Sequence, residues 1–267
     1  MAVTQSSPVL ISLTAFGAAE VLRHGQLYFT ELSHAAGADG VEVRGELLRD
    51  AQAELPALRE CVRSLGMQVV YSSPHGLWRA DGALDDAALS EALEHAALLG
   101  ATRLKMSIGG FGAGSSVSFA TLRERLSQHA VTLVIENDQT VSAGSIGALM
   151  RFFAGCDEAR LPLGMTFDMG NWHYVGECSL AAADAFAGRV TYLHCKGVQR
   201  LPAKWVAVPL TESVAAWRSV MAPMAAGITW AIEYPLVGDD LLAVTAAQIA
   251  LLRETSRQLN ETRAWRN

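Results

Sequence analysis

Lysine is the scarcest charged residue in this chain. Only Lys105, Lys196 and Lys204 occur among the 267 residues, and eighteen arginines supply the rest of the positive charge. Acidic residues outnumber these cations, and the formal net charge is −6. A surface that binds nucleic acid needs clustered basic side chains to neutralise phosphates. This acidic chain has no such cluster, so the sequence argues against nucleic acid as a partner.

Cysteine is also sparse, and its spacing gives no disulfide framework. Cys61, Cys156, Cys178 and Cys195 form no CxxC pair and no regular pattern. We therefore expect reduced thiols and a cytoplasmic protein. The first residues lack the basic start, apolar stretch and cleavage site of a signal peptide. No apolar run approaches the roughly 18–20 residues of a membrane span, so we expect no membrane partner.

Apolar residues, in contrast, are plentiful. They make up 51% of the sequence and charged residues only 18%, a composition typical of a globular protein. A length of 267 residues fits one large α/β domain or two small domains. No composition shift, internal repeat or low-complexity segment marks a boundary, so we expect a single domain over residues 1–267.

Eight short runs rich in Val, Ile, Thr and aromatic residues have the length and composition of β-strands. Their apolar character is nearly continuous, which is typical of parallel strands that are covered on both faces. The runs are residues 9–16, 39–44, 67–73, 102–108, 131–137, 163–169, 190–196 and 228–234.

Longer amphipathic segments separate the strands, clearest in residues 51–65, 85–99 and 239–259. Gly66 and Gly100 stand where helix C-caps belong. Eight strands alternating with about eight helices predict an α/β protein with a single (β/α)₈ TIM barrel. A doubly wound open sheet is the alternative. The first strand-to-helix turn carries no glycine-rich phosphate loop, which counts against a nucleotide-binding form of that sheet.

Polar residues close most of these strands, and barrel enzymes carry their catalytic residues at that end. The last four strands end in Glu136, Asp168, His194 and Glu233. Barrel closure would gather these side chains on one rim. Three carboxylates and an imidazole suit Mn²⁺, Mg²⁺, Co²⁺ or Zn²⁺. Crowded carboxylates repel one another unless a cation neutralises them, so the sequence predicts a site for one divalent metal ion.

Further charged residues accompany this set. Lys196 is two residues after His194 and should share its face of the strand. Glu42 and Arg44 close the second strand, as a structural ion pair at the rim or as substrate contacts. Lys105, in the fourth strand, faces either the site or a surrounding helix. These alternatives remain open from the sequence.

Other rim residues are expected in the strand-to-helix loops. His75 should follow the third strand in a loop, as an ordinary polar residue or a substrate contact. Aromatic residues in such loops could wall a sugar pocket or pack in the core or an interface. They are Trp78, Phe111, Trp172 and Trp205. Cys195 should point away from His194 and not bind the metal.

The four strand-end residues resemble the metal-binding set of the xylose isomerase-like TIM barrels. They stand in the segments VIEN, FDMGN, YLHCKG and AIEYP, separated by 32, 26 and 39 residues. The resemblance covers essentially the whole chain and is strongest to the sugar phosphate isomerase/epimerase, ketose 3-epimerase and inosose isomerase-like branch. Each motif alone is unspecific, and the ordered set of four carries the resemblance.

The resemblance implies a divalent-metal-dependent isomerase or epimerase of a sugar, sugar acid or sugar phosphate, acting through a metal-stabilised enediolate. It implies that the metal ligands Glu136 and Glu233 also serve as acid and base. Arg200 carries over as a contact to substrate and to a metal-bound glutamate. Dimers or tetramers are common among such proteins, so a homo-oligomer is compatible with the resemblance.

Three positions depart from the family pattern. Asn171 stands where the epimerases usually have a substrate-binding histidine, and Gly197 replaces the aspartate of His-x-Lys-Asp. Lys105 is unusual in a plain epimerase and, like Arg44, would suit an anionic substrate. A lyase of a keto-sugar acid, either decarboxylase or dehydratase, is therefore the alternative function.

Two further functional classes fit the sequence less well. An endonuclease-type phosphodiester hydrolase needs more rim histidines and a basic face, which this acidic chain with seven scattered histidines does not supply. A non-catalytic sugar-binding relative would not need the four-residue set. Failure to bind metal would support that last class.

Overall fold

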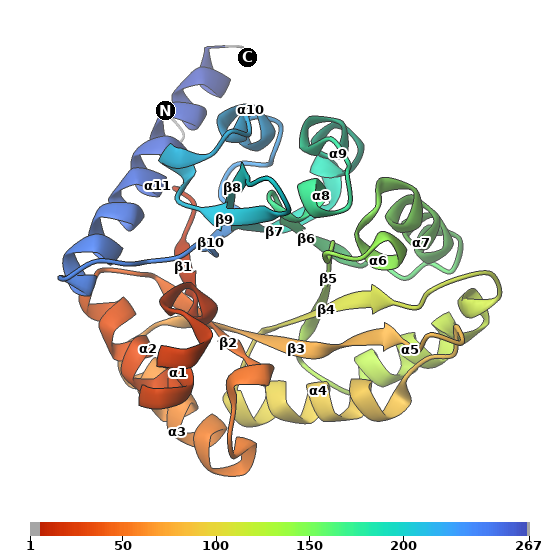
Figure 1. Cartoon of the computed structure of the whole chain (residues 1–267). Helices are drawn as coiled ribbons and strands as arrows, with labels where there is room; N and C mark the ends of the chain where they lie inside the picture. Colours follow the sequence, from red (N-terminus) through yellow and green to blue (C-terminus); the bar gives the residue numbers. More distant parts are fainter. Residues whose placement is uncertain (1–5, 266–267) are drawn as a thin grey trace.

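Eight parallel strands close into a barrel with helices around it in the computed structural model, which describes residues 6–265 (Figure 1). This confirms the predicted (β/α)₈ TIM barrel. Around the barrel the strands are β1 (Val9–Ser12), β2 (Gly40–Arg44), β3 (Gln68–Trp78), β4 (Arg103–Gly109), β5 (Thr132–Glu136), β6 (Gly164–Asp168), β7 (Val190–Cys195) and β10 (Thr229–Ile232). A separate antiparallel hairpin, β8 (Gly197–Arg200) and β9 (Trp205–Val208), directly follows β7.

The helices begin and end where capping chemistry allows. Asp50 and Asp85 accept hydrogen bonds from backbone amides three residues on, at the starts of two helices. Gly100 ends the second of these with φ +72°, a left-handed cap that favours glycine. The α-helices are α1 (Ala18–His24), α2 (Gln26–Ala35), α3 (Ala51–Ser64), α4 (Asp86–Leu99), α5 (Phe119–Ser127), α6 (Val141–Gly144), α7 (Ile146–Glu158), α8 (Asn171–Tyr174), α9 (Ser179–Phe186), α10 (Trp217–Met221) and α11 (Leu241–Ala264). The 3₁₀ helices are η1 (Leu13–Phe16), η2 (Gly45–Leu47), η3 (Ser115–Ser118), η4 (Ala187–Arg189) and η5 (Leu210–Glu212).

The inside of the barrel is layered. Leu10, Val70, Tyr192 and Ala231 form a small buried cluster that is separate from the main apolar core between strands and helices. Each of the four precedes a polar strand-end residue by two positions, so both point inward, one layer apart. An apolar floor thus lies beneath the polar rim.

Two strand boundaries differ from the prediction. The first strand ends at Ser12 and continues as η1, whereas β3 extends to Trp78. His75, expected in a loop, therefore lies in a strand, where the β3–β4 register shifts between Ser72 and Gly76. A Cβ on Gly76 would lie 2.7 Å from the Gly109 Cα, so this close strand approach requires glycine.

An aromatic cluster anchors the extended end of β3. Trp78 makes edge-on contacts with Phe111, Phe119 and Phe152 at ring-centroid distances of 5.0, 5.9 and 5.7 Å. Its indole nitrogen donates to the Ser118 hydroxyl at 3.0 Å. In Figure 1, β3 and β4 run side by side toward α5, which carries part of this cluster. The cluster therefore fixes a wall that rises from the barrel rim.

Two tryptophans that were expected in loops lie in the core instead. Trp78 belongs to β3 and is only 2% exposed, and Trp172 belongs to α8 and is fully buried. The Trp172 ring stacks on Phe186 at a centroid distance of 5.9 Å. Neither side chain is placed to wall a sugar pocket.

We expect Trp78→Ala to lower the free energy of unfolding by about 3–5 kcal/mol, because it empties the centre of the aromatic cluster. Urea unfolding followed by circular dichroism measures the change. Trp265 is 90% exposed and is the matched control, with little expected change on replacement by Ala. Equal losses from both substitutions would contradict the anchoring role.

Candidate active site

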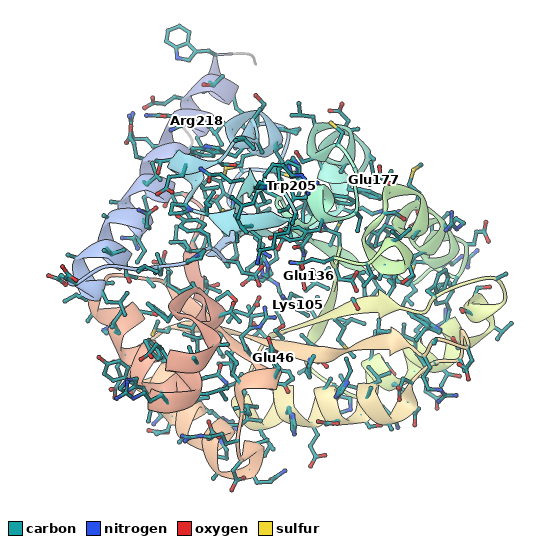
Figure 2. The ribbon with its side chains drawn as sticks, in the orientation of Figure 1. Glu46, Lys105, Glu136, Glu177, Trp205 and Arg218 are labelled. Carbon is teal, nitrogen blue, oxygen red and sulfur yellow. The ribbon has the colours of Figure 1, made fainter. Side chains whose placement is uncertain are left out.

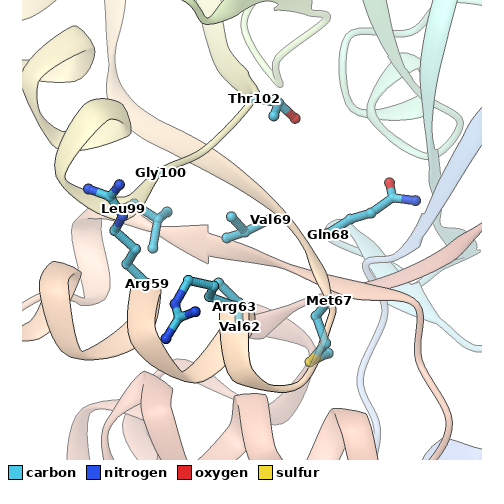
Figure 3. Close-up of a pocket in the computed structure, with 9 residues that line it drawn as sticks. All are labelled: Arg59, Val62, Arg63, Met67, Gln68, Val69, Leu99, Gly100 and Thr102. Atoms are coloured by element: carbon cyan, nitrogen blue, oxygen red, sulfur yellow. The ribbon is translucent and has the colours of Figure 1, made fainter.

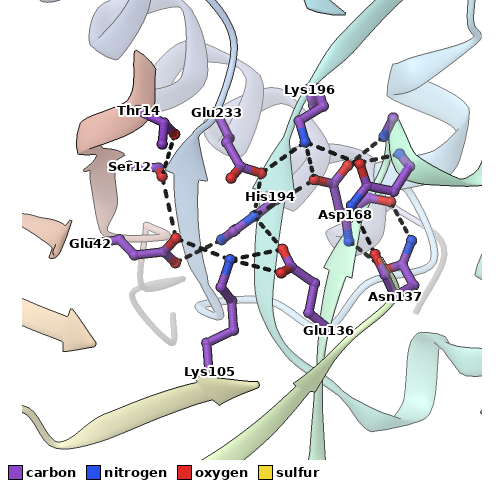
Figure 4. Close-up of polar contacts among 12 residues, drawn as sticks. Ser12, Thr14, Glu42, Lys105, Glu136, Asn137, Asp168, His194, Lys196 and Glu233 are labelled. Atoms are coloured by element: carbon purple, nitrogen blue, oxygen red, sulfur yellow. Dashed lines mark hydrogen bonds and ion pairs between the residues drawn. The ribbon is translucent and has the colours of Figure 1, made fainter. Parts of the chain in front are cut away.

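Four polar side chains converge inside the carboxyl-terminal rim of the barrel (Figure 4). They are Glu136 at the end of β5, Asp168 at the end of β6, His194 near the end of β7 and Glu233 directly after β10. One ligand atom from each lies within 4.8 Å of the others. These four strands are consecutive around the barrel, so its closure brings the residues together. We call them the four-residue cluster.

The imidazole of His194 lies at the centre of this cluster. Its Nδ1 is 2.6 Å from Glu233 Oε2, 3.0 Å from Glu136 Oε1 and 3.7 Å from Asp168 Oδ2. Burial opposes protonation of this buried ring, but the negative charges of Glu233 and Glu42 raise the pKa of His194 well above its usual value.

Two of the three lysines of the chain are buried against these carboxylates. Lys105 points into the barrel, with Nζ 2.9 Å from Glu136 Oε2 and 3.1 Å from Glu42 Oε1. Lys196 shares the face of His194, as alternation predicts, and its Nζ lies 2.6 Å from Asp168 Oδ2. Figure 2 shows Lys105 and Glu136 together within the ring of strands. Of the two positions that the sequence left open for Lys105, the structure shows the barrel interior and not a surrounding helix.

Arg44 adds a third permanent cation. Its Nη1 lies 2.9 Å from Glu42 Oε1 and 2.8 Å from Glu233 Oε1, and its Nη2 lies 2.8 Å from Glu46 Oε1. Protein cations therefore already offset much of the repulsion between the buried carboxylates. Crowding of acids at the rim is consequently weaker support for a metal than the sequence alone implied.

Exposure divides the four-residue cluster into two pairs. The Glu136 and Glu233 side chains are 15% and 10% exposed, whereas those of Asp168 and His194 are fully buried. Burial favours the neutral form of both glutamates. The charge of Lys105 nevertheless lowers the pKa of Glu136, and the charges of His194 and Lys196 lower that of Glu233. Both glutamates are thus held as carboxylates and keep a small part of their side chains exposed.

Hydrogen bonds from the backbone occupy one carboxylate oxygen of Asp168, so that the other oxygen faces the four-residue cluster. Its Oδ1 accepts hydrogen bonds from the backbone amides of Gly170 at 2.8 Å and Asn171 at 2.9 Å, leaving Oδ2 to face Lys196. Asn137 holds the same turn, because its side chain accepts from the Asp168 amide at 2.8 Å and donates to the Asp168 carbonyl at 3.0 Å.

A cavity of about 350 Å³ opens beside the cluster. Its lining includes Glu136 together with Arg44, Glu46, Ser72, Ser73, Pro74, His75, Ser107 and Asp138. The extended end of β3 supplies one wall, and His75 lies on that wall. Glu136 is therefore the residue that joins the four-residue cluster to an open, polar space.

Another cavity, of about 490 Å³, lies at the opposite end of the barrel (Figure 3). It is bounded by Arg59 and Arg63 of α3, the end of α4 and the start of β3. Barrel enzymes place their chemistry at the carboxyl ends of the strands, and this cavity lies near the amino ends. We therefore take the cavity beside the four-residue cluster as the candidate active site.

A family model described as the xylose isomerase-like TIM barrel matches residues 30–255. This chain belongs to the xylose isomerase-like TIM barrel family. No curated protein matches it significantly. In residues 6–265, no helix has both the length and the apolar character that crossing a membrane requires.

Solved structures with this family's fold cover nearly the whole chain. A xylose isomerase domain protein from Planctomyces limnophilus has a TM-score of 0.67 at 17% identity, covering 98% of this chain and 100% of that chain. An L-ribulose 3-epimerase has a TM-score of 0.67 at 17% identity, covering 97% of each chain. The probable 3-DHS dehydratase AsbF from Bacillus anthracis has a TM-score of 0.66 at 12% identity, covering 92% and 98%. At these identities the likeness shows the fold alone.

The structure places Arg200, which the resemblance carried over, and Asn171, which stands where the family has a histidine, on different elements. Arg200 lies in the β8–β9 hairpin, where its guanidinium packs 5.5 Å from the Trp205 ring centroid. Within the described part of the chain it forms no ion pair with the cluster, and Arg44 contacts Glu233 instead. The Asn171 side chain is buried, and its Oδ1 accepts from Lys196 at 3.1 Å, so it orients that lysine.

Sequence reasoning assigned Glu42 no role beside the histidine. Its Oε2 lies 2.9 Å from His194 Nε2, on the side of the ring away from the other carboxylates. Glu42 reaches His194 because β2 and β7 both line the barrel interior, although they are not neighbouring strands. The order of strands in the sequence does not predict a contact between strands that are not adjacent. Glu42 and Arg44 are two residues apart on the same strand, so they lie on the same face, and this spacing was the sequence feature that indicated an inward Glu42.

The donor set fits a divalent cation. Three carboxylates and one imidazole nitrogen face a common point, and the second nitrogen of that imidazole is occupied by a further carboxylate. Buried metal-ligating histidines ordinarily have such a partner. This pairing, together with the mutual reach of the four ligand atoms, supports metal binding more strongly than the acidic composition does.

Proposed function

We propose that this protein is a divalent-metal-dependent isomerase or epimerase of a sugar, sugar acid or sugar phosphate. One observation carries the proposal. The two partly exposed members of the four-residue cluster are Glu136 and Glu233, the carboxylates that would carry out acid–base chemistry, and Glu136 lines the cavity. The L-ribulose 3-epimerase of the same fold lends support to this choice of reaction.

Glu136, Asp168, His194 and Glu233 would hold the metal ion. When bound, a Mn²⁺, Mg²⁺, Co²⁺ or Zn²⁺ ion supplies a Lewis acid that polarises a substrate carbonyl. The Asp168 and His194 side chains are fully buried and have no access to substrate. Their part is therefore to bind the ion, which leaves proton transfer to the two glutamates.

The chain's own residues supply the acid–base chemistry. One ionised glutamate would remove a proton from the carbon next to the carbonyl, and the other would relay a proton from a solvent water molecule to the opposite face. Lys105 fixes the Glu136 carboxylate, while Arg44 and Lys196 fix that of Glu233. Because both glutamates are ionised at rest, the delivered proton derives from solvent. The reaction should therefore incorporate solvent hydrogen into the product.

A lyase acting on a keto-sugar acid is the second candidate, and the buried cations favour it. Lys196 Nζ lies 3.0 Å from Glu233 Oε2, so a lyase would have a cation beside one of its two glutamates. Lys105 and Arg44 add positive charge that suits a substrate carboxylate. The probable 3-DHS dehydratase, which has the same fold, supports considering a lyase reaction.

Product analysis in D₂O separates the two reactions. The metal-loaded protein is incubated with keto-sugars and keto-sugar acids, and the products are examined by mass spectrometry and NMR. We expect an epimer or isomer that has gained one deuterium and lost no other mass. Loss of water would indicate a dehydratase and release of CO₂ a decarboxylase. Absence of turnover across the panel, with metal bound, would count against both.

A further inference from the structure

We infer that Glu42 is a positioning residue, which holds His194 in the tautomer that a metal ion needs. This inference rests on the proposed metal-dependent function. The Glu42 side chain is fully buried, and its Oε2 lies 2.9 Å from His194 Nε2. Figure 4 shows Glu42 and Glu233 on opposite sides of the imidazole. The two ring nitrogens thus face different groups.

The other oxygen of Glu42 is held entirely by donors. Oε1 accepts hydrogen bonds from Ser12 Oγ at 3.3 Å and Arg44 Nη1 at 2.9 Å, and Lys105 Nζ lies 3.1 Å away. An ammonium, a guanidinium and a hydroxyl can all donate to this oxygen. With three donors around Oε1 and the imidazole beside Oε2, Glu42 is placed as a carboxylate that only accepts hydrogen bonds.

An acceptor beside Nε2 determines where the imidazole carries its proton. Nε2 must keep its hydrogen in order to donate to Glu42, so Nδ1 is the nitrogen that can give up its proton. Nδ1 is the atom that faces Glu136, Asp168 and Glu233. A metal ligand needs a free lone pair, and this arrangement provides it on the correct side.

Glu42→Gln should reverse the tautomer, not merely weaken the contact. Lys105 and Arg44 require an acceptor at the position of Oε1, so the amide oxygen of Gln must occupy it. The amide NH₂ group then faces Nε2 of His194 and needs an acceptor there. The imidazole proton moves to Nδ1, where it blocks metal ligation.

The matched control is Glu46→Gln. Glu46 also pairs with Arg44, at 2.8 Å from Nη2, but forms no contact with His194 in the described structure. Both substitutions remove one negative charge from the same arginine. Glu42→Asp is a second variant, because it keeps the charge for Lys105 and Arg44 while withdrawing the carboxylate from Nε2.

The experiment combines metal titration with ¹⁵N NMR of histidine-labelled protein. Calorimetric titration with Zn²⁺ should show binding about 10- to 100-fold weaker in Glu42→Gln than in wild type, an intermediate loss in Glu42→Asp, and little change in Glu46→Gln. The ring ¹⁵N shifts of Zn²⁺-loaded wild type should report a proton on Nε2. At equal Zn²⁺ concentration, Glu42→Gln should show a resonance of a ring protonated at Nδ1.

The outcomes separate this inference from the proposed function. If wild type binds the metal and Glu42→Gln binds equally well with Nε2 still protonated, the positioning role is wrong and the metal centre stands. Equal losses in Glu42→Gln and Glu46→Gln overturn the role too, because the effect would then come from charge around Arg44. A wild type that binds no metal overturns both proposals. Circular dichroism of each variant confirms that the fold is retained.

Discussion

If the proposed epimerisation is correct, Glu136→Gln and Glu233→Gln should each lower its kcat by about 10³-fold, since each removes one of the two groups proposed to transfer a proton. The amide oxygen of Gln can still accept from Lys105 or Arg44, so the fold and the cavity should remain. Steady-state kinetics on the substrate found by product analysis measures the loss. Metal content, measured in parallel, separates the loss of a base from the loss of a ligand.

The two variants should also differ from each other in a diagnostic way. If each glutamate serves one face of the substrate, Glu136→Gln should still exchange the reacting hydrogen of one epimer with D₂O, and Glu233→Gln that of the other. NMR of the recovered substrates detects this exchange. Glu60→Gln is the control for charge removal, because Glu60 is an exposed partner of Arg63 on α3. If both variants exchanged the same epimer's hydrogen with D₂O, the two-base mechanism would be wrong.

His194→Ala should abolish specific metal binding and activity with it. In the proposed metal site, His194 supplies the nitrogen ligand at the centre of the four-residue cluster. Its loss leaves only carboxylates, for which Lys105 and Lys196 compete with a metal ion. We expect about one metal ion per chain in wild type and a trace in the variant, measured by inductively coupled plasma mass spectrometry. Metal at 100 times its Kd should stabilise wild type by about 2.7 kcal/mol and His194→Ala by far less.

The prediction for His194→Ala is tested further with a control histidine variant and with removal and re-addition of the metal. His129 is exposed near the other end of the barrel, and His129→Ala should keep both metal and stabilisation. Chelation should inactivate wild type, and added Mn²⁺ or Zn²⁺ should restore it. If wild type holds no metal and gains no stability from it, the four-residue metal site is wrong, and Lys105 with Lys196 becomes the centre of the chemistry.

The sequence predicted the barrel and the inward rim residues because both follow from local rules. Apolar runs of strand length define the eight strands, and strand alternation places Lys196 on the face of His194. The sequence left the direction of Lys105 open, and the structure places it inside the barrel, with Leu104 and Met106 beside it in the core. The barrel then needs only closure to bring the ends of β5, β6, β7 and β10 together.

Strand length and alternation do not predict contacts between strands on different sides of the barrel, nor the packing of loops. The contact between Glu42 and His194 joins β2 to β7, which are not neighbours. Pro74 and Gly76 indicate a turn by their types, yet pairing with β4 carries the strand on to Trp78. Arg200 was placed by family resemblance, and the β8–β9 hairpin takes it to Trp205 instead.

In the described residues, the buried cluster of Leu10, Val70, Tyr192 and Ala231 closes the barrel interior beneath the candidate site. A buried apolar layer offers no passage to a polyhydroxylated molecule, because such a molecule would lose its hydrogen bonds to water on the way. Substrate and product must therefore use the same mouth and exclude one another. In the proposed reaction, product should therefore inhibit competitively with respect to substrate.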